Sequence, residues 1–156
     1  MWKRLKDKII AMLQGQTATQ LQEVYDYEVA EFGGDPAATL TPSAESADYR
    51  TTSANRRVYA FSLILWVKRG GTRDDKEAEG VLTDLVDSVT RLFDKYYTLG
   101  SGSPGSALVS ETGYTMIKVE AVPGEWFYSQ RNDLYRGALI TVRCHVDVDV
   151  NLIAAT

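Results

Sequence analysis

The chain is poor in the residues that most often build catalytic and metal sites. It has 156 residues with one cysteine, Cys144, and one histidine, His145. A single cysteine excludes an internal disulfide and is typical of a reducing compartment. The histidine has no HExxH motif or Cys/His cluster beside it, so the spacing of a zinc site is missing. No apolar run approaches the ~18 residues that a membrane-spanning helix needs.

A nucleophile–base pair is also missing. Cys144 and His145 are neighbours in an alternating segment, so their side chains point to opposite faces of a strand. Asp147 and Asp149 share the face of His145, and a solvated acidic strand is favoured there over a metal site. The Gly-rich residues 100–105 match neither GxGxxG nor GxxxxGK[ST]. The sequence therefore predicts no catalytic residue, no metal and no cofactor, and a small hydrolase is the least favoured class.

Composition indicates one ordinary globular domain over residues 1–156. Hydrophobic residues make up 44% and charged residues 24% of the chain. A chain of this length buries roughly 70% of the surface that its unfolded form exposes, so one core can hold it. The net charge of −4 indicates no general affinity for nucleic acid.

Two amphipathic helices are expected. The first spans residues 2–14 and ends near Gly15, with a basic outer face. The second spans residues 74–97 and is capped by Thr72 or Asp74. Its apolar residues recur at spacings of three and four: Ala78, Val81, Leu82, Leu85, Val86, Val89, Leu92, Phe93 and Tyr96. Gly80 costs roughly 1 kcal/mol in a helix interior, and a close helix–sheet approach is one explanation for it.

Two strands stand out from the pattern. Val58–Lys68 is apolar on both faces, which predicts a central strand covered on both sides. Tyr135–Val150 alternates and predicts a long strand with one buried and one polar face. Residues 123–128 read as an aromatic turn. Shorter strands are expected within residues 21–32, 37–41 (an edge position) and 114–121. The predicted fold is α+β, a mixed or antiparallel sheet of about four to six strands with two main helices packed on one face.

A polar arm, residues 43–57, leads into the central strand. It is either a loop or a β-arm, and it is too poor in apolar residues to form its own core, so we expect it to order against a neighbouring subunit. Arg56 and Arg57 end the arm, and the planar fork of arginine suits bidentate pairing with carboxylates of that neighbour. The candidate partners are Asp84, Asp87, Asp147 and Asp149.

Aromatic residues suggest a contact surface. Nine tyrosines and three tryptophans could stack on single-stranded nucleic acid, but the negative charge favours protein interfaces instead. The flexible residues 100–113 and the aromatic turn are candidates for contacts along the axis of an assembly. The side chains concerned in and beyond that turn are Trp126, Phe127, Tyr128, Tyr135 and Arg136.

Three segments, residues 36–61, 77–99 and 121–150, resemble a family of small tail proteins of long-tailed bacteriophages that is similar to the tail terminators. The resemblance covers roughly residues 20–150 and keeps the order of the parts. Its specific pieces are Asp48-Tyr49-Arg50-Thr51-Thr52, Asn55-Arg56-Arg57-Val58-Tyr59-Ala60-Phe61, Phe93-Asp94-Lys95 and Tyr135-Arg136.

This resemblance implies an α/β subunit of a hexameric ring in the virion. Such a ring assembles in the host cytoplasm, caps the tail tube at its head-proximal end, stops tube polymerisation and meets the head-side connector. Its partners would be further copies of itself, the tail tube protein and the connector or stopper protein, with DNA passing through the lumen. The expected subunit-interface residues are Asp48, Tyr49, Arg50, Thr51, Asn55, Arg56 and Arg57. The alternative is a head–tail stopper or other connector subunit of the neck.

Overall fold

The computed structural model describes residues 1–15, 20–29, 31–49, 54–70, 73–97, 99, 113–129 and 134–154. Its elements in chain order are α1 (Trp2–Gly15), β1 (Glu23–Tyr25), β2 (Ala37–Tyr49), β3 (Ala54–Lys68), α2 (Asp75–Lys95), β4 (Tyr114–Tyr128), β5 (Tyr135–Asp149) and α3 (Val150–Ala154). The five strands form one sheet in the order β1-β2-β3-β5-β4. β1 runs parallel to β2 and the other neighbours are antiparallel, so the predicted α+β fold with a mixed sheet is confirmed.

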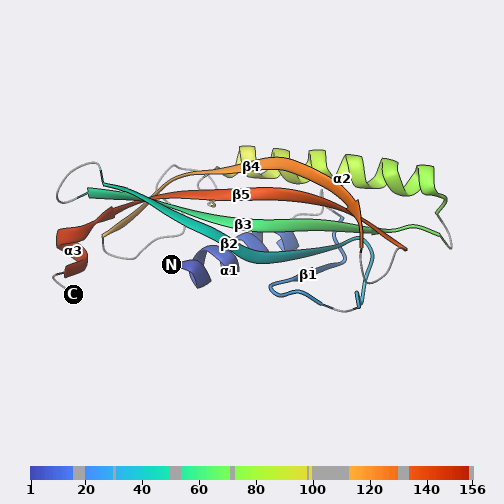
Figure 1. The fold of residues 1–156 in the computed structure, drawn as a ribbon, viewed down its shortest axis with the longest axis horizontal. Coiled ribbons are helices and arrows are strands. Elements are labelled where there is room, and N and C mark those ends of the chain that lie inside the picture. The colour runs from blue at the N-terminus through green and yellow to red at the C-terminus, as the bar shows by residue number, and fades with distance from the viewer. Residues whose placement is uncertain are drawn as a thin grey trace.

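Long strands give the molecule an elongated shape, with β3 at its centre (Figure 1). β3 and β5 pair over 15 residues each, from Ala54 opposite Asp149 to Lys68 opposite Tyr135. At about 3.4 Å per residue, the two ends of this ladder lie roughly 45–50 Å apart. The arm therefore begins at one end of the sheet, and the aromatic residues 126–128 and 135 lie at the other.

Both long helices pack on one face of the sheet, as predicted. The central strand sends Tyr59, Phe61 and every second residue to Val67 into this core, where all are buried. α1 contributes its stripe of Leu5, Ile9 and Leu13, and the Trp2 ring meets Tyr59 and Phe61 edge-on with centroids 5.0 and 5.1 Å apart. α2 buries Ala78, Leu82, Leu85, Val86, Val89, Leu92 and Phe93.

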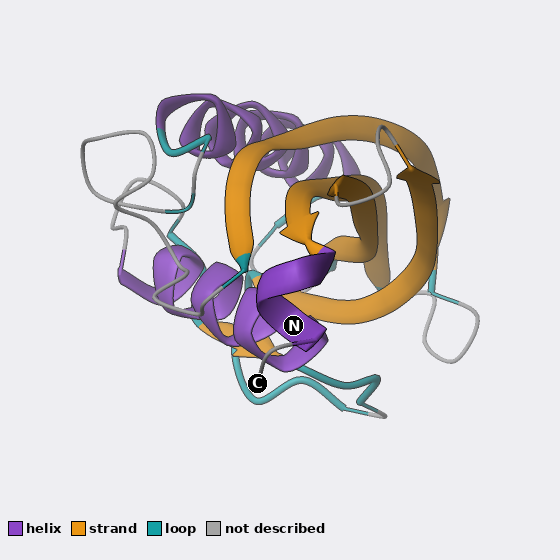
Figure 2. Cartoon of the chain, turned by 90° about the vertical axis from the view of Figure 1, so that its left-hand side faces the viewer, coloured by secondary structure: helices purple, strands orange, loops and turns teal. Residues whose placement is uncertain are grey.

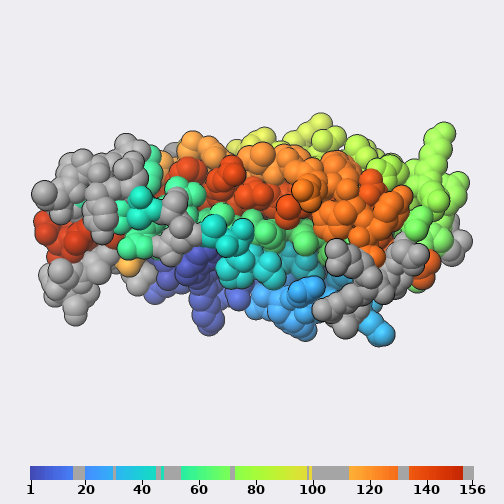
Figure 3. All heavy atoms as spheres, in the orientation of Figure 1, coloured from blue at the N-terminus to red at the C-terminus, as the bar shows by residue number. Residues whose placement is uncertain are grey.

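In the described ranges the other face of the sheet carries no helix, so the prediction that β3 is covered on both sides is wrong for this part of the chain. Its outward side chains from Val58 to Trp66 are half-buried. Figure 2 shows why: the sheet curls strongly, with α1 and α2 outside the curl, so residues on the inner side shield one another. In Figure 3 the strands reach the surface between α2 and α1. We name this side the open face.

Several element boundaries differ from prediction. β3 begins at Ala54 rather than Val58, and β2 continues to Tyr49, so the β-arm alternative is confirmed for the described residues of the arm. The aromatic turn at residues 123–128 is wrong, because β4 continues to Tyr128 through bulges at Met116/Lys118 and Pro123/Trp126. These polar or proline-containing segments are extended because a neighbouring strand pairs with them, which local composition does not reveal.

Smaller corrections concern the edge strands and the last turn. The expected edge position of residues 37–41 is wrong for Ala37–Thr39, which β1 covers. Asp74 caps α2, its carboxylate accepting from the backbone N–H of Glu77 at 2.7 Å. The short helix α3 was not expected; Asp149 caps it by accepting from Asn151 and Leu152 N–H at 3.0 and 3.2 Å.

Gly80 does not mark a close helix–sheet approach, so that explanation is wrong. A Cβ built on Gly80 meets nothing within 4 Å, and the residue is exposed on the outer side of α2. Among the described residues, no helix is long and apolar enough to cross a bilayer.

Candidate assembly surfaces

The arm is a β-hairpin whose outer edge is open. Its strands pair from Ser46 opposite Val58 to Tyr49 opposite Asn55; Arg50 and Thr51 lie outside the described residues. β1 pairs only with Ala37–Thr39, so in the described part of the chain the rest of β2 has a strand neighbour on one side alone. A free strand edge presents N–H and C=O groups to which another chain can pair. The arm thus has the backbone geometry of an assembly element.

Arg56 is fastened within its own subunit. Its Nε lies 2.6 Å from Oδ1 of Asp147 and its terminal nitrogen 3.0 Å from Oδ2, a bidentate pair on the open face. Asp147 was one of the four predicted carboxylate partners, but it belongs to the same chain. Asp149 is engaged as the α3 cap. The exposed Asp84 and Asp87 are therefore the candidates without an ion pair to any described residue.

Among the predicted interface residues whose burial the structure describes, Asn55 is deeply buried whereas Arg56 and Arg57 are half-buried. Asn55 is 2% exposed and lies on the helix side of β3, opposite Tyr49 and Val148. Its side-chain Oδ1 accepts no hydrogen bond from the described residues. A buried amide oxygen without a donor is unfavourable by about 1–3 kcal/mol. The base of the arm therefore contains a polar position that the described subunit does not satisfy.

An aromatic cluster occupies the opposite end of the open face. Trp66 contacts Phe127 and Phe32 with centroids 5.3 and 5.6 Å apart, and Phe32 contacts Tyr135 at 4.8 Å. A Cβ on Gly137 would lie 2.7 Å from the Trp66 ring, so only glycine fits beneath it. Two of the five predicted axial-contact residues, Phe127 and Tyr135, therefore pack inside the subunit. The sequence analysis did not include Phe32 in this cluster, because Phe32 and Trp66 are far apart in sequence and come together only when the chain folds.

The other three predicted axial residues lie on the helix side of this end. Trp126 and Tyr128 are 38% and 50% exposed. The guanidinium carbons of Arg69 and Arg136 lie 4.5 and 4.6 Å from the Tyr128 ring centroid, which is cation–π geometry. The structure thus places two exposed aromatic residues at the end of the sheet opposite the arm, and two arginines contact one of them, Tyr128.

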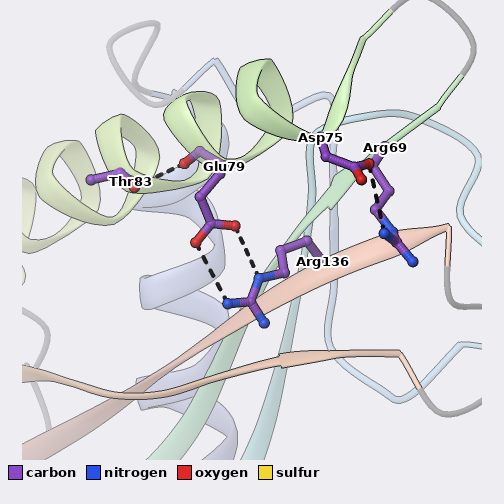
Figure 4. Close-up of polar contacts among 5 residues, drawn as sticks. All are labelled: Arg69, Asp75, Glu79, Thr83 and Arg136. Atoms are coloured by element: carbon purple, nitrogen blue, oxygen red, sulfur yellow. Dashed lines mark hydrogen bonds and ion pairs between the residues drawn. The ribbon is translucent and has the colours of Figure 1, made fainter.

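Two ion pairs anchor those arginines to α2 (Figure 4). The Arg136 Nε donates to Glu79 Oε2 at 3.0 Å, and a nitrogen of Arg69 lies 3.6 Å from Asp75 Oδ1. The strand ends, the Tyr128 ring and the first turns of α2 therefore form one connected cluster. The sequence analysis did not predict that Arg69, Asp75 and Glu79 belong to this cluster, because their spacing matches no motif.

Cys144 and His145 point to opposite faces, as predicted. Burial raises the pKa of the Cys144 thiol to about 12, which leaves it protonated and unreactive. His145 Nε2 lies 3.3 Å from Glu120 Oε2. Hydrogen bonds from Lys118 and, less strongly, from His145 lower the pKa of Glu120. No three metal-ligating side chains gather among the described residues.

Comparisons with known proteins give a likeness of fold. No protein-family model matches the chain, and no curated protein sequence does. A solved structure, "Virion of native gene transfer agent (GTA) particle", contains a chain with a TM-score of 0.59 and 14% identity, and the match covers 92% of this chain and 94% of that chain. Because the match spans nearly both chains, the likeness concerns the whole domain rather than one motif.

Proposed function

We propose that this protein is a structural subunit of a phage-like virion and caps the tail tube as a ring. The observation that carries the proposal is the end-to-end likeness of fold to a chain of the gene transfer agent virion. The resemblance of residues 36–61, 77–99 and 121–150 to tail terminators supports the position at the tube end. The proposed activity is geometric, with no catalytic step.

Termination of the tube needs a ring with two different faces. A ring of asymmetric subunits joined head to tail has such faces, because each subunit presents the same end in the same direction. The arm and the exposed Trp126–Tyr128 lie at opposite ends of β5, which suits contacts to different partners. One ring face would match the last tube ring, and the other would offer no acceptor for a further tube subunit.

DNA passage is compatible with the charge of the chain. Non-specific DNA binding is driven by cations that neutralise phosphates. The net charge of −4 provides no excess of such cations. A lumen built from this subunit would let DNA pass without holding it.

The arm is proposed to hold neighbouring subunits together. Deleting residues 44–54 removes the outer part of β2 and joins Ser43 to Asn55. Because Ala44 lies opposite Ala60, the residues just after Asn55 must form the new turn, and the β3–β5 ladder is left from about Ala60 onward. We expect a folded monomer that no longer forms rings or caps tubes. Circular dichroism and native mass spectrometry check the two outcomes, and undiminished rings would contradict the role of the arm.

Particles lacking the protein test the terminator role directly. We expect tails of abnormal, unregulated length that fail to join heads, because nothing ends tube growth. Electron microscopy of null particles measures the tail lengths. Tails of correct length on particles that leak DNA or fail only at the head would replace the terminator proposal with the head–tail stopper.

A further inference from the structure

The outer side of α2 is acidic along its middle. Residues 77–87 contain four carboxylates and no lysine or arginine: Glu77, Glu79, Asp84 and Asp87. Glu79 is bound by Arg136. Asp84 and Asp87 are exposed and form no ion pair with the described residues. Arg91 follows Asp87 by one turn on the same side of α2 but forms no ion pair with the described residues, so Asp84 and Asp87 remain available to a partner.

Gly80 lies in the same stripe. Gly80, Asp84 and Asp87 follow spacings of four and three, so they share one side of the helix, opposite the buried residues. Glycine is unfavourable in a helix interior, yet beyond its own stretch of helix no atom of the described residues comes within 4 Å of the position where its Cβ would be. The folded subunit gives no reason for this glycine, whereas a second backbone docking on α2 would need the space.

The outer side of α1 has the complementary character. Arg4, Lys8 and Ala11 follow the same spacing and are exposed. Lys3 adds a third cation, and the one carboxylate on this side, Asp7, lies 3.9 Å from it. Lys8 forms no ion pair with any residue of the described ranges. The α1 stripe thus has two cations followed by a small residue, Ala11. The α2 stripe has a small residue, Gly80, followed by two carboxylates, so the two stripes match when the helices run antiparallel.

The two helices face opposite edges of the sheet. α2 packs on β4, β3 and β5, and α1 on β1 and β2, while β4 and β1 are the two edge strands. Figure 2 shows them as separate columns outside the curl. Two different, complementary patches on opposite sides of one subunit are what a head-to-tail contact requires.

We propose that the α2 stripe (Gly80, Asp84, Asp87) docks on the α1 stripe (Arg4, Lys8, Ala11) of a second copy of this chain. The inference rests on the proposed ring and names its subunit contact. Each subunit gives one stripe and receives the other, so the contact repeats until the ring closes. Charge pairing selects the partner and the register, and Gly80 with Ala11 lets the helices approach closely.

Charge reversal with rescue tests the contact. Asp84→Lys with Asp87→Lys places like charges together, and so does Arg4→Glu with Lys8→Glu. Each pair should reduce the fraction of rings by at least about tenfold, because opposed like charges disfavour association. Combining all four changes restores the attraction and should restore the rings. The readouts are native mass spectrometry of the purified chain and capped tail length in complementation of null particles.

A matched control separates this effect from net charge. Glu23→Lys with Glu31→Lys makes the same change of charge at exposed positions outside both helices, and rings should persist. Unchanged circular dichroism and thermal midpoint show that each variant folds; where Arg4→Glu disturbs folding, Lys8→Glu alone replaces the pair.

The outcomes separate this contact from the ring itself. Loss on each reversal and recovery on their combination supports the contact. Rings that survive both reversals overturn it and leave the proposed function standing. A third outcome is that the α2 variant forms intact rings that fail to cap tubes and that the α1 changes do not rescue. The α2 stripe would then bind another virion protein, and the proposed contact would be wrong. Absence of wild-type rings in both assays would overturn the proposed function as well.

Discussion

At the scale of single residues, the polar contacts of the open face decide which groups remain for assembly. Arg56 and Asp147 join adjacent strands, β3 and β5, with exposed fractions of 22% and 39% for their side chains. A bidentate pair that is partly shielded from water is stronger than an ordinary surface pair. It holds the base of the arm to β5.

A double-mutant cycle measures this pair. Arg56→Ala and Asp147→Ala should each lower the free energy of unfolding, and the cycle should give a coupling of about 1 kcal/mol. The Lys118/Glu120 pair is the control, because its side chains are 46% and 38% exposed. Its coupling should be about 0.5 kcal/mol or less. If chemical denaturation gives equal coupling energies for the two pairs, the bidentate geometry adds nothing to the free energy of unfolding.

The neighbouring Cys144 gives a second test at this scale. Its buried thiol, with a pKa of about 12, should not react with a thiol reagent at pH 8 until the protein unfolds. Cys144→Ser should cost about 1–2 kcal/mol of stability, because it buries a hydroxyl in the core. That variant and His145→Ala should both keep capping activity. Rapid labelling of the native protein would contradict the packing described for β5.

At the scale of elements, the sequence predicts the helices and strands whose apolar residues recur at the period of the buried face. The α2 core stripe and the alternation of β5 were predicted because every third or fourth, or every second, residue is apolar. The sequence left the arm open between a loop and a β-arm, and it indicated a turn at the end of β4, because strand partners that are distant in sequence hold both segments extended. The same limit applies to the site: Arg56 was recognised as a carboxylate binder, but its partner depends on the register of β3 against β5.

Gly80 provides the test that belongs to α2. Gly80→Ala should raise the free energy of unfolding by about 1 kcal/mol, because alanine favours the helix and its Cβ enters open space. The same change should weaken ring formation. Gly15→Ala, also in open space but at the last residue of α1, is the control and should leave rings unchanged. A more stable monomer with undiminished rings would leave Gly80 unexplained.

At the scale of the whole molecule, one sheet carries four separate surfaces. The helices give it two oppositely charged outer stripes, the arm extends from one end, and exposed aromatic residues lie at the other. Each surface faces a different direction because β3 and β5 are long and antiparallel. A compact domain of the same composition could not separate these contacts as far.

Salt dependence tests the assembly as a whole. Exposed charges are screened over about 10 Å at 0.1 M salt and about 3 Å at 1 M. Rings held by the α1 and α2 stripes should therefore dissociate as salt rises, while the hydrophobic core of the monomer stays folded. Sedimentation and circular dichroism at increasing sodium chloride measure the two effects separately. Rings that tighten with salt would indicate an apolar contact instead.

The full-length pairing of β3 with β5 also has a mechanical consequence. When the arm is pulled one way and the Tyr128 end the other, force runs parallel to the strands. Hydrogen bonds between antiparallel strands lie perpendicular to the strands, so this pull shears the whole ladder at once instead of opening one bond after another. A subunit with this geometry resists tension along its long axis and yields more easily when its β2 edge is peeled sideways.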